Sequence, residues 1–146
     1  MSVVEKAIFL HEVDVFSDVP ADQLAYLAAI AEERSKEPGQ TIYSEEDPAE
    51  ELFLVLEGRV RLHRGEVEVT VVGPGEAFGT WALFDDEPRV MSATVQDEPV
   101  ELLRIDRAEF IEVLADNVQI TSAILKAVVR RLRALGRAVQ GRRAAS

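Results

Sequence analysis

Between Thr41 and Ile105 the apolar residues come in short runs separated by turn residues, and this spacing constrains the fold more than any other feature of the chain. The runs have the length of β-strands and are rich in Val, Leu and Ile. They cover residues 41–43, 52–56, 59–63, 67–72, 90–95 and 100–105. We expect about eight strands at this close spacing, which predicts an antiparallel barrel or a jelly roll.

The run 59–63 shows the alternation of a half-buried strand most clearly. Because successive side chains point to opposite faces, Val60 and Leu62 should face the core and His63 should face water. Arg64 and Gly65 follow directly and predict a hairpin turn.

Helical spacing precedes the strands. Residues 3–15 have a mixed apolar pattern typical of a helix or helical turn, and a second apolar stripe runs from about Pro20 to about Glu33. Pro38 and Gly39 are expected to end this block. We therefore assign residues 1–37 to helices and residues 38–105 to the barrel.

Helical spacing returns after the barrel. Asp106 is expected to cap a helix, and a longer helix should run from Ile120 to about Val139, with Gly141 ending it. Residues 106–141 are thus predicted to form a C-terminal helix pair. With 146 residues, of which 47% are apolar, the chain has the size and core of one domain over residues 1–146.

The charge is unevenly distributed. The formal net charge is −11, and residues 121–146 hold seven of the 16 basic residues and no acidic one, which leaves −18 for residues 1–120. The overall charge argues against direct nucleic-acid binding. The basic segment indicates either a solvated helix face or a helix that docks on the acidic body, a partner or an anionic membrane surface.

Several classes of site are not expected. The chain has no cysteine and only two histidines, His11 and His63, so we expect neither a disulfide nor a metal site. It lacks nucleophile motifs and clustered carboxylate and histidine pairs, so we do not expect an enzyme. No signal peptide or membrane span is recognised, which favours the cytoplasm or the cytoplasmic part of a membrane protein.

The stretch from Gly73 to Val95 has the composition of an anion site. Its glycines allow tight turns and a close approach of the backbone to a ligand. Residues 80–84 could form a short helical turn with free N–H groups. Arg89 follows, and its planar guanidinium group can donate two hydrogen bonds to the oxygens of one phosphate.

This stretch resembles the phosphate-binding cassette of the cyclic nucleotide-binding domain family, in the pairs Phe78-Gly79, Ala82-Leu83 and Pro88-Arg89. The resemblance implies an α+β, mainly β fold: an eight-stranded antiparallel jelly-roll barrel with N-terminal helices and a C-terminal helix pair. It implies cAMP or cGMP as ligand, with Arg89 holding the cyclic phosphate. The ligand-binding residues expected from it are Phe78, Gly79, Thr80, Trp81, Ala82, Arg89, Val90 and Ser92.

Two positions differ from the family. Thr80 replaces the glutamate that takes the ribose 2′-hydroxyl, which removes a charge-assisted hydrogen bond. Val90 and Met91 also stand between Arg89 and the strand that begins at Ser92, so that Met91 would take the arginine's place if that strand set the register.

The resemblance implies a regulatory domain in which a bound cyclic nucleotide moves the C-terminal helix. The alternative is a degenerate domain that binds no nucleotide and acts as an interaction or dimerisation module, within a larger transporter or channel for example. Trp81 fits either a packed core position or a stacking partner for the ligand. The apolar stripe of the C-terminal helix either covers the barrel or forms a homodimer seam.

Overall fold

The computed structural model describes residues 1–80 and 84–145. The helices are α1 (Val3–His11), the short 3-10 helix η1 (Asp14–Phe16), α2 (Ala21–Ile30), α3 (Arg107–Asp116) and α4 (Val118–Ala145). The strands are β1 (Glu32–Lys36), β2 (Thr41–Tyr43), β3 (Glu51–Glu57), β4 (Val60–Arg64), β5 (Val67–Val72), β6 (Ala77–Phe78), β7 (Ser92–Val95) and β8 (Val100–Asp106).

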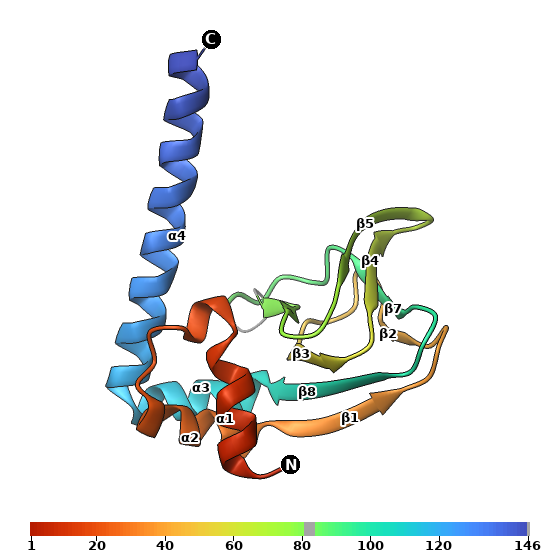
Figure 1. Ribbon diagram of the computed structural model, residues 1–146, viewed down its shortest axis with the longest axis horizontal. Helices are drawn as coiled ribbons and strands as arrows, with labels where there is room; N and C mark the ends of the chain where they lie inside the picture. Colours follow the sequence, from red (N-terminus) through yellow and green to blue (C-terminus); the bar gives the residue numbers. More distant parts are fainter. Residues whose placement is uncertain (81–83, 146) are drawn as a thin grey trace.

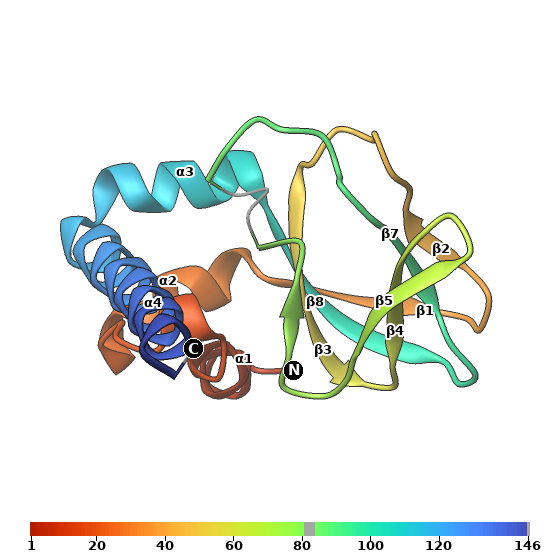
Figure 2. The same ribbon diagram turned by 90° about the horizontal axis from the view of Figure 1, so that it is seen from above.

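The eight strands form two four-stranded sheets, ordered β1-β8-β3-β6 and β2-β7-β4-β5, in which neighbouring strands are antiparallel. Figure 2 shows the helices gathered on one side of the molecule and the sheets on the other. The predicted fold class, an α+β jelly roll with N-terminal and C-terminal helices, is confirmed.

Strands β3 and β8 hold the two parts of the molecule together because both of their faces are buried. In β3, Leu54 belongs to the cluster shared with the helices, whereas Phe53 and Val55 belong to the cluster between the sheets. In β8, Leu103 and Leu102 divide in the same way. Burial on both faces explains why these two strands have continuous apolar runs rather than alternating ones.

Most of the local predictions for β4 and its neighbours hold, but His63, expected to face water, is only partly exposed and its ring nitrogens form hydrogen bonds with the Gly65 carbonyl oxygen and the Thr94 hydroxyl. Val60 and Leu62 are buried between the sheets, and β4 and β5 form a hairpin in which Gly65 has a positive φ of 56°. At the start of α3, the Asp106 carboxylate accepts a hydrogen bond from the Glu109 amide, so the predicted cap is present.

The expected boundary between helices and barrel at residue 38 is wrong. Helix α2 ends at Ile30, and residues 32–36 form β1, which pairs with β8 along its whole length. Strand β1 is an edge strand of the polar sequence EERSK, held by backbone hydrogen bonds. Its side chains have no apolar alternation, so the sequence carries no strand signal there.

Two further boundaries differ from those expected. Strand β7 begins at Ser92 rather than Val90, and α4 continues through Gly136 and Gly141 to Ala145. A glycine within a helix costs only about 1 kcal/mol relative to alanine. The strong helix formers around both glycines offset that cost.

Helix α4 rises from the side of the body as a single long rod (Figure 1). Its first half packs against η1 and α3, and two of its arginines form ion pairs with the body, Arg130 with Asp18 and Arg131 with Asp14. The basic helix therefore docks in part on the acidic body, one of the possibilities that its charge indicated. Among the described helices, none is both long and apolar enough to cross a membrane.

The turn between β3 and β4 depends on a glycine. Gly58 has a φ of +88°, and a Cβ added there would lie 2.6 Å from the Pro99 carbonyl oxygen. We expect Gly58→Ala to lower the free energy of unfolding by about 2 kcal/mol or more, because left-handed strain adds to a backbone clash.

The matched control is Gly65→Ala, at a positive φ with open space around the added methyl group. It should lose about 1 kcal/mol from strain alone. Urea unfolding of both variants measures the difference, and equal losses would show that the contact at Pro99 relaxes freely.

Candidate functional site

A hollow of about 350 Å³ lies at one end of the barrel, between β2, β4 and the segment that leads into β7. Its walls are largely apolar, with Tyr43, Ala49, Leu62 and Met91 contributing side chains. Arg89 lies in the same wall. The arrangement of an apolar hollow with one placed cation is typical of a small-molecule site.

The backbone of Arg89 is fixed by the loop before β3. The Arg89 amide donates to the Asp47 carbonyl oxygen, and the Arg89 carbonyl oxygen accepts from the Glu46 amide, both at 2.9 Å. This reciprocal pair turns the side chain of residue 89 toward the barrel, where it is only 7% exposed. The next two residues, Val90 and Met91, line the same hollow.

The guanidinium of Arg89 lies over the aromatic ring of Tyr43, with its central carbon 3.9 Å from the ring centroid. Its Nη2 donates to the Glu51 carbonyl oxygen at 2.7 Å, and Nη1 lies 3.5 Å from the Gly79 carbonyl oxygen. A Cβ at residue 79 would lie 2.6 Å from Nη1, so the close approach of the arginine requires glycine there.

Arg89 retains unused hydrogen-bonding capacity. Its Nε is buried without a partner, and no carboxylate within the described residues forms an ion pair with it. Burial lowers the pKa of Arg89, while Tyr43, Glu51 and Asp47 act in the opposite direction. Because arginine stays charged even so, the hollow holds a cation whose remaining donors suit an anion.

Three aromatic rings pack together beside the arginine, and Tyr43 is the one that contacts it. Tyr43 packs against Phe53 and Phe78, whose own rings are stacked 5.3 Å apart. Burial raises the pKa of the Tyr43 phenol, against the opposing effect of Arg89, so the ring stays neutral. Phe78 is buried and does not line the hollow, and so it acts on the site through Tyr43.

The other predicted site residues are not all brought together. Val90 and Gly79 line the hollow, but the Ser92 hydroxyl accepts a hydrogen bond from the Glu45 amide and so helps to hold that loop. Thr80 lies along a different hollow, of about 290 Å³, together with Arg131 of α4. Trp81 and Ala82 were also predicted, and both lie outside the described residues.

Two acidic residues of the hollow were missed by the sequence reasoning. Asp85 and Glu87 line it with Arg89 and Met91. Pro88 and Val90 line it as well, so residues 87–91 contribute consecutively and no period in the sequence singles out the two acidic residues.

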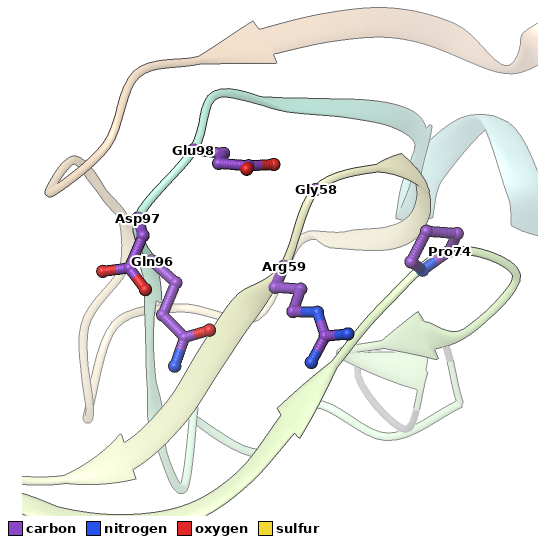
Figure 3. Close-up of a pocket in the computed structure, with 6 residues that line it drawn as sticks. All are labelled: Gly58, Arg59, Pro74, Gln96, Asp97 and Glu98. Atoms are coloured by element: carbon purple, nitrogen blue, oxygen red, sulfur yellow. The ribbon is translucent and has the colours of Figure 1, made fainter.

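A second, larger hollow of about 500 Å³ lies where the β3–β4, β5–β6 and β7–β8 turns meet. Figure 3 shows the side chains of Arg59 and Asp97 pointing in different directions rather than toward a common point. Both residues are exposed, and no ion pair of Arg59 occurs within the described part of the chain. The hollow around Arg89 is therefore the better candidate site.

Comparison with known proteins agrees with this geometry. Residues 33–117 match the family described as cyclic nucleotide-binding domain. The chain is 29% identical over 124 residues to the CRP-like cAMP-activated global transcriptional regulator of Mycobacterium tuberculosis, covering 82% of this chain and 55% of that protein. It thus spans about half the length of this relative.

Solved structures give the same result. The N-terminal domain of a transcriptional regulator from Streptomyces coelicolor A3(2) superposes with a TM-score of 0.78 at 34% identity, covering 86% of this chain and 91% of the other. The regulatory domain of Toxoplasma gondii PKA, crystallised with cAMP, gives a TM-score of 0.70 at 26% identity, covering 75% and 43%.

The match to the family extends over more than half of the chain and includes the barrel, Gly79 and Arg89. This chain belongs to the cyclic nucleotide-binding domain family, whose members are typically regulatory modules without catalytic activity.

Proposed function

We propose that the hollow around Arg89 binds a cyclic nucleotide, cAMP or cGMP, and that Arg89 holds the cyclic phosphate. The observation that carries this proposal is the buried guanidinium, which has unused donors and no carboxylate partner within the described residues. A cation in this state gains most from a ligand that is both anionic and able to accept several hydrogen bonds.

The rest of the hollow suits the remainder of a nucleotide. Its volume of about 350 Å³ falls in the range of small-molecule sites. Tyr43, Leu62 and Met91 offer apolar surface to a sugar or base, while Gly79 lets the backbone approach the ligand. In the proposed complex, N–H groups of residues 79–82 complete the phosphate site, as the family resemblance implies.

The same proposal includes a route to the C-terminal helix. Thr80 and Arg131 line one hollow together with η1 residues, so the cassette and α4 meet across η1. A ligand that shifts the segment after Gly79 would change this meeting point and favour one position of α4 over another. The effector moved by α4 would belong to a longer protein or a partner.

Helix α4 also carries the seam for a homodimer. Val118, Leu125, Leu132 and Val139 follow at seven-residue steps, with Val128 and Leu135 between them. Leu125, Leu132 and Leu135 are each about 60% exposed, at 62%, 63% and 59%. This heptad spacing is that of a two-stranded coiled coil, and we propose that two copies pair along it.

One observation favours the alternative, a degenerate domain that serves only as an interaction module. Thr80, which replaces the family's glutamate, does not line the hollow around Arg89. If no other group binds the sugar, affinity for a nucleotide would be low. The domain would then act through the surface of α4, by binding a partner or a second copy. A regulator, transporter or channel could each use such a module.

Titration calorimetry of the chain with cAMP and then cGMP tests the nucleotide proposal. We expect saturable binding of at least one of them, and loss of that binding in Arg89→Met, which keeps the packing on Tyr43 but removes charge and donors. The variant should unfold within about 1 kcal/mol of the parent, because removing a buried cation also removes its desolvation cost.

Arg64→Met is the matched control, since Arg64 is exposed at the β4–β5 hairpin. It should bind as the parent does. Binding that survives in Arg89→Met would show that the phosphate is held elsewhere, and no heat up to millimolar ligand would favour the degenerate module.

The contact between α4 and the body gives a second prediction. Asp18→Asn removes the ion pair with Arg130, which contributes about 0.5–1 kcal/mol for partly exposed partners. Hydrogen exchange in the first half of α4 should become a few times faster. The control is Asp22→Asn, at an exposed α2 position without an ion pair among the described residues, and it should leave the exchange rates of α4 unchanged. If the two variants exchange at the same rate, apolar packing alone holds α4.

The proposed dimer gives a third prediction. Leu132→Glu places a charge in the seam and should convert dimers to monomers in sedimentation equilibrium, with helix content preserved by circular dichroism. Ala134→Glu adds the same charge at an exposed position two residues away and off the stripe, and should leave the dimer intact. A parent chain that is monomeric at every concentration would overturn the dimer proposal.

A further inference from the structure

The loop that holds the backbone of Arg89 contains one strained residue. Glu46 has a φ of 70°, in the left-handed region that residues other than glycine rarely adopt. Its amide donates to the Arg89 carbonyl oxygen, and the carbonyl oxygen of the next residue, Asp47, accepts from the Arg89 amide. Because a left-handed residue costs free energy, this conformation persists only where surrounding contacts hold it. The contacts that hold residues 44–47 therefore also hold the backbone of Arg89.

Glu45 joins this loop to two other elements of the barrel. Its amide donates to the Ser92 hydroxyl at the start of β7 at 3.0 Å, and its carboxylate Oε1 accepts from the Gly65 amide at 2.7 Å. The second bond is the stronger type, because its acceptor is charged. The Ser44 amide donates to the Asp47 carboxylate, but this bond lies within the loop and does not fix the place of the loop in the barrel.

Gly65, the partner of the Glu45 carboxylate, is itself anchored. It lies in the turn between β4 and β5, and Nδ1 of His63 lies 2.7 Å from its carbonyl oxygen. Nε2 of the same ring lies 2.8 Å from the Thr94 hydroxyl of β7. Strand β7 pairs with both β2 and β4, so the turn is connected to the middle of its sheet. The carboxylate of Glu45 thus connects the strained loop to a turn that is held on its other side.

We infer that Glu45 is a positioning residue, whose carboxylate holds the 44–47 loop on the β4–β5 turn and, through that loop, the backbone of Arg89. Glu45 does not line the hollow around Arg89, so the role requires no contact with a ligand. Its effect on affinity rests on the proposed function. A guanidinium that is already fixed loses less freedom when a ligand binds, and binding is tighter for that reason.

Residue-resolved hydrogen exchange, measured by NMR without a ligand, tests the positioning role. In Glu45→Ala the Gly65 amide loses its acceptor. The amides of Glu46 and Arg89 should then exchange about tenfold faster, because the loss of a charge-assisted hydrogen bond makes opening of the loop more frequent. Glu45→Gln keeps an acceptor oxygen without the charge, so these amides should exchange only about threefold faster than in the parent chain.

The matched control is Glu66→Ala, which removes the same charge from an exposed position next to Gly65. No ion pair of Glu66 occurs within the described part of the chain. This variant should leave the amides of Glu46 and Arg89 at their parent rates. If Glu45→Ala accelerates exchange of the Gly65 amide alone, the 44–47 loop holds itself and the inference is overturned.

Titration calorimetry with cAMP measures the consequence for binding. Glu45→Ala should bind about threefold to tenfold more weakly than the parent chain, and Glu45→Gln should give an intermediate affinity. Glu66→Ala, which changes the net charge equally, should bind as the parent does. If cAMP binds and Glu45→Ala keeps the parent affinity, the inference is overturned while the proposed function stands. If the parent chain binds neither cAMP nor cGMP, the proposed function fails, and the exchange rates alone decide the role of Glu45.

Discussion

The guanidinium of Arg89, buried against the ring of Tyr43, is the interaction on which the rest of the site depends. Taking a cation out of water costs several kcal/mol even after relaxation. The ring face, the Glu51 carbonyl oxygen and the backbone pair with residues 46 and 47 offset part of that cost. The rest of the cost is not offset, because the Arg89 Nε remains buried without a hydrogen-bond partner. A site of this kind is organised for an anion before the anion arrives, so little of the binding free energy is spent on arranging it.

The barrel keeps this arrangement in place because its central strands cannot move independently. Strand β3 supplies the Glu51 carbonyl oxygen to Arg89, Phe53 to the ring stack, and Leu54 to the helical side. Strand β3 also pairs with β8 from Glu51 to Glu57. A displacement of β3 would therefore disturb the site, the space between the sheets and the helical packing together, and the rigidity of interiors packed on both faces opposes it.

The sequence predicted those features that depend on apolar period and on glycine, and it missed those that depend on backbone pairing. Val60, Leu62, the hairpin at Gly65 and the cap at Asp106 follow from local chemistry, and so they were predictable. Strand β1 was missed because an edge strand of polar residues is defined by its hydrogen bonds to β8. The placement of Arg89 follows from its backbone hydrogen bonds to residues 46 and 47, which are far away in sequence, so the local sequence could not predict it.

The separation of Thr80 from Arg89 changes how recognition and coupling are divided in this chain. A single residue that both bound the sugar and faced α4 would link the two directly. Here Thr80 lines the hollow that Arg131 also lines, whereas Arg89 lines the hollow at the end of the barrel. Under the proposed function, a ligand at Arg89 would then act on α4 through the backbone that joins Gly79, in one hollow, to Thr80, in the other. Coupling of this kind depends on a displacement of the backbone rather than on a direct contact between the ligand and α4.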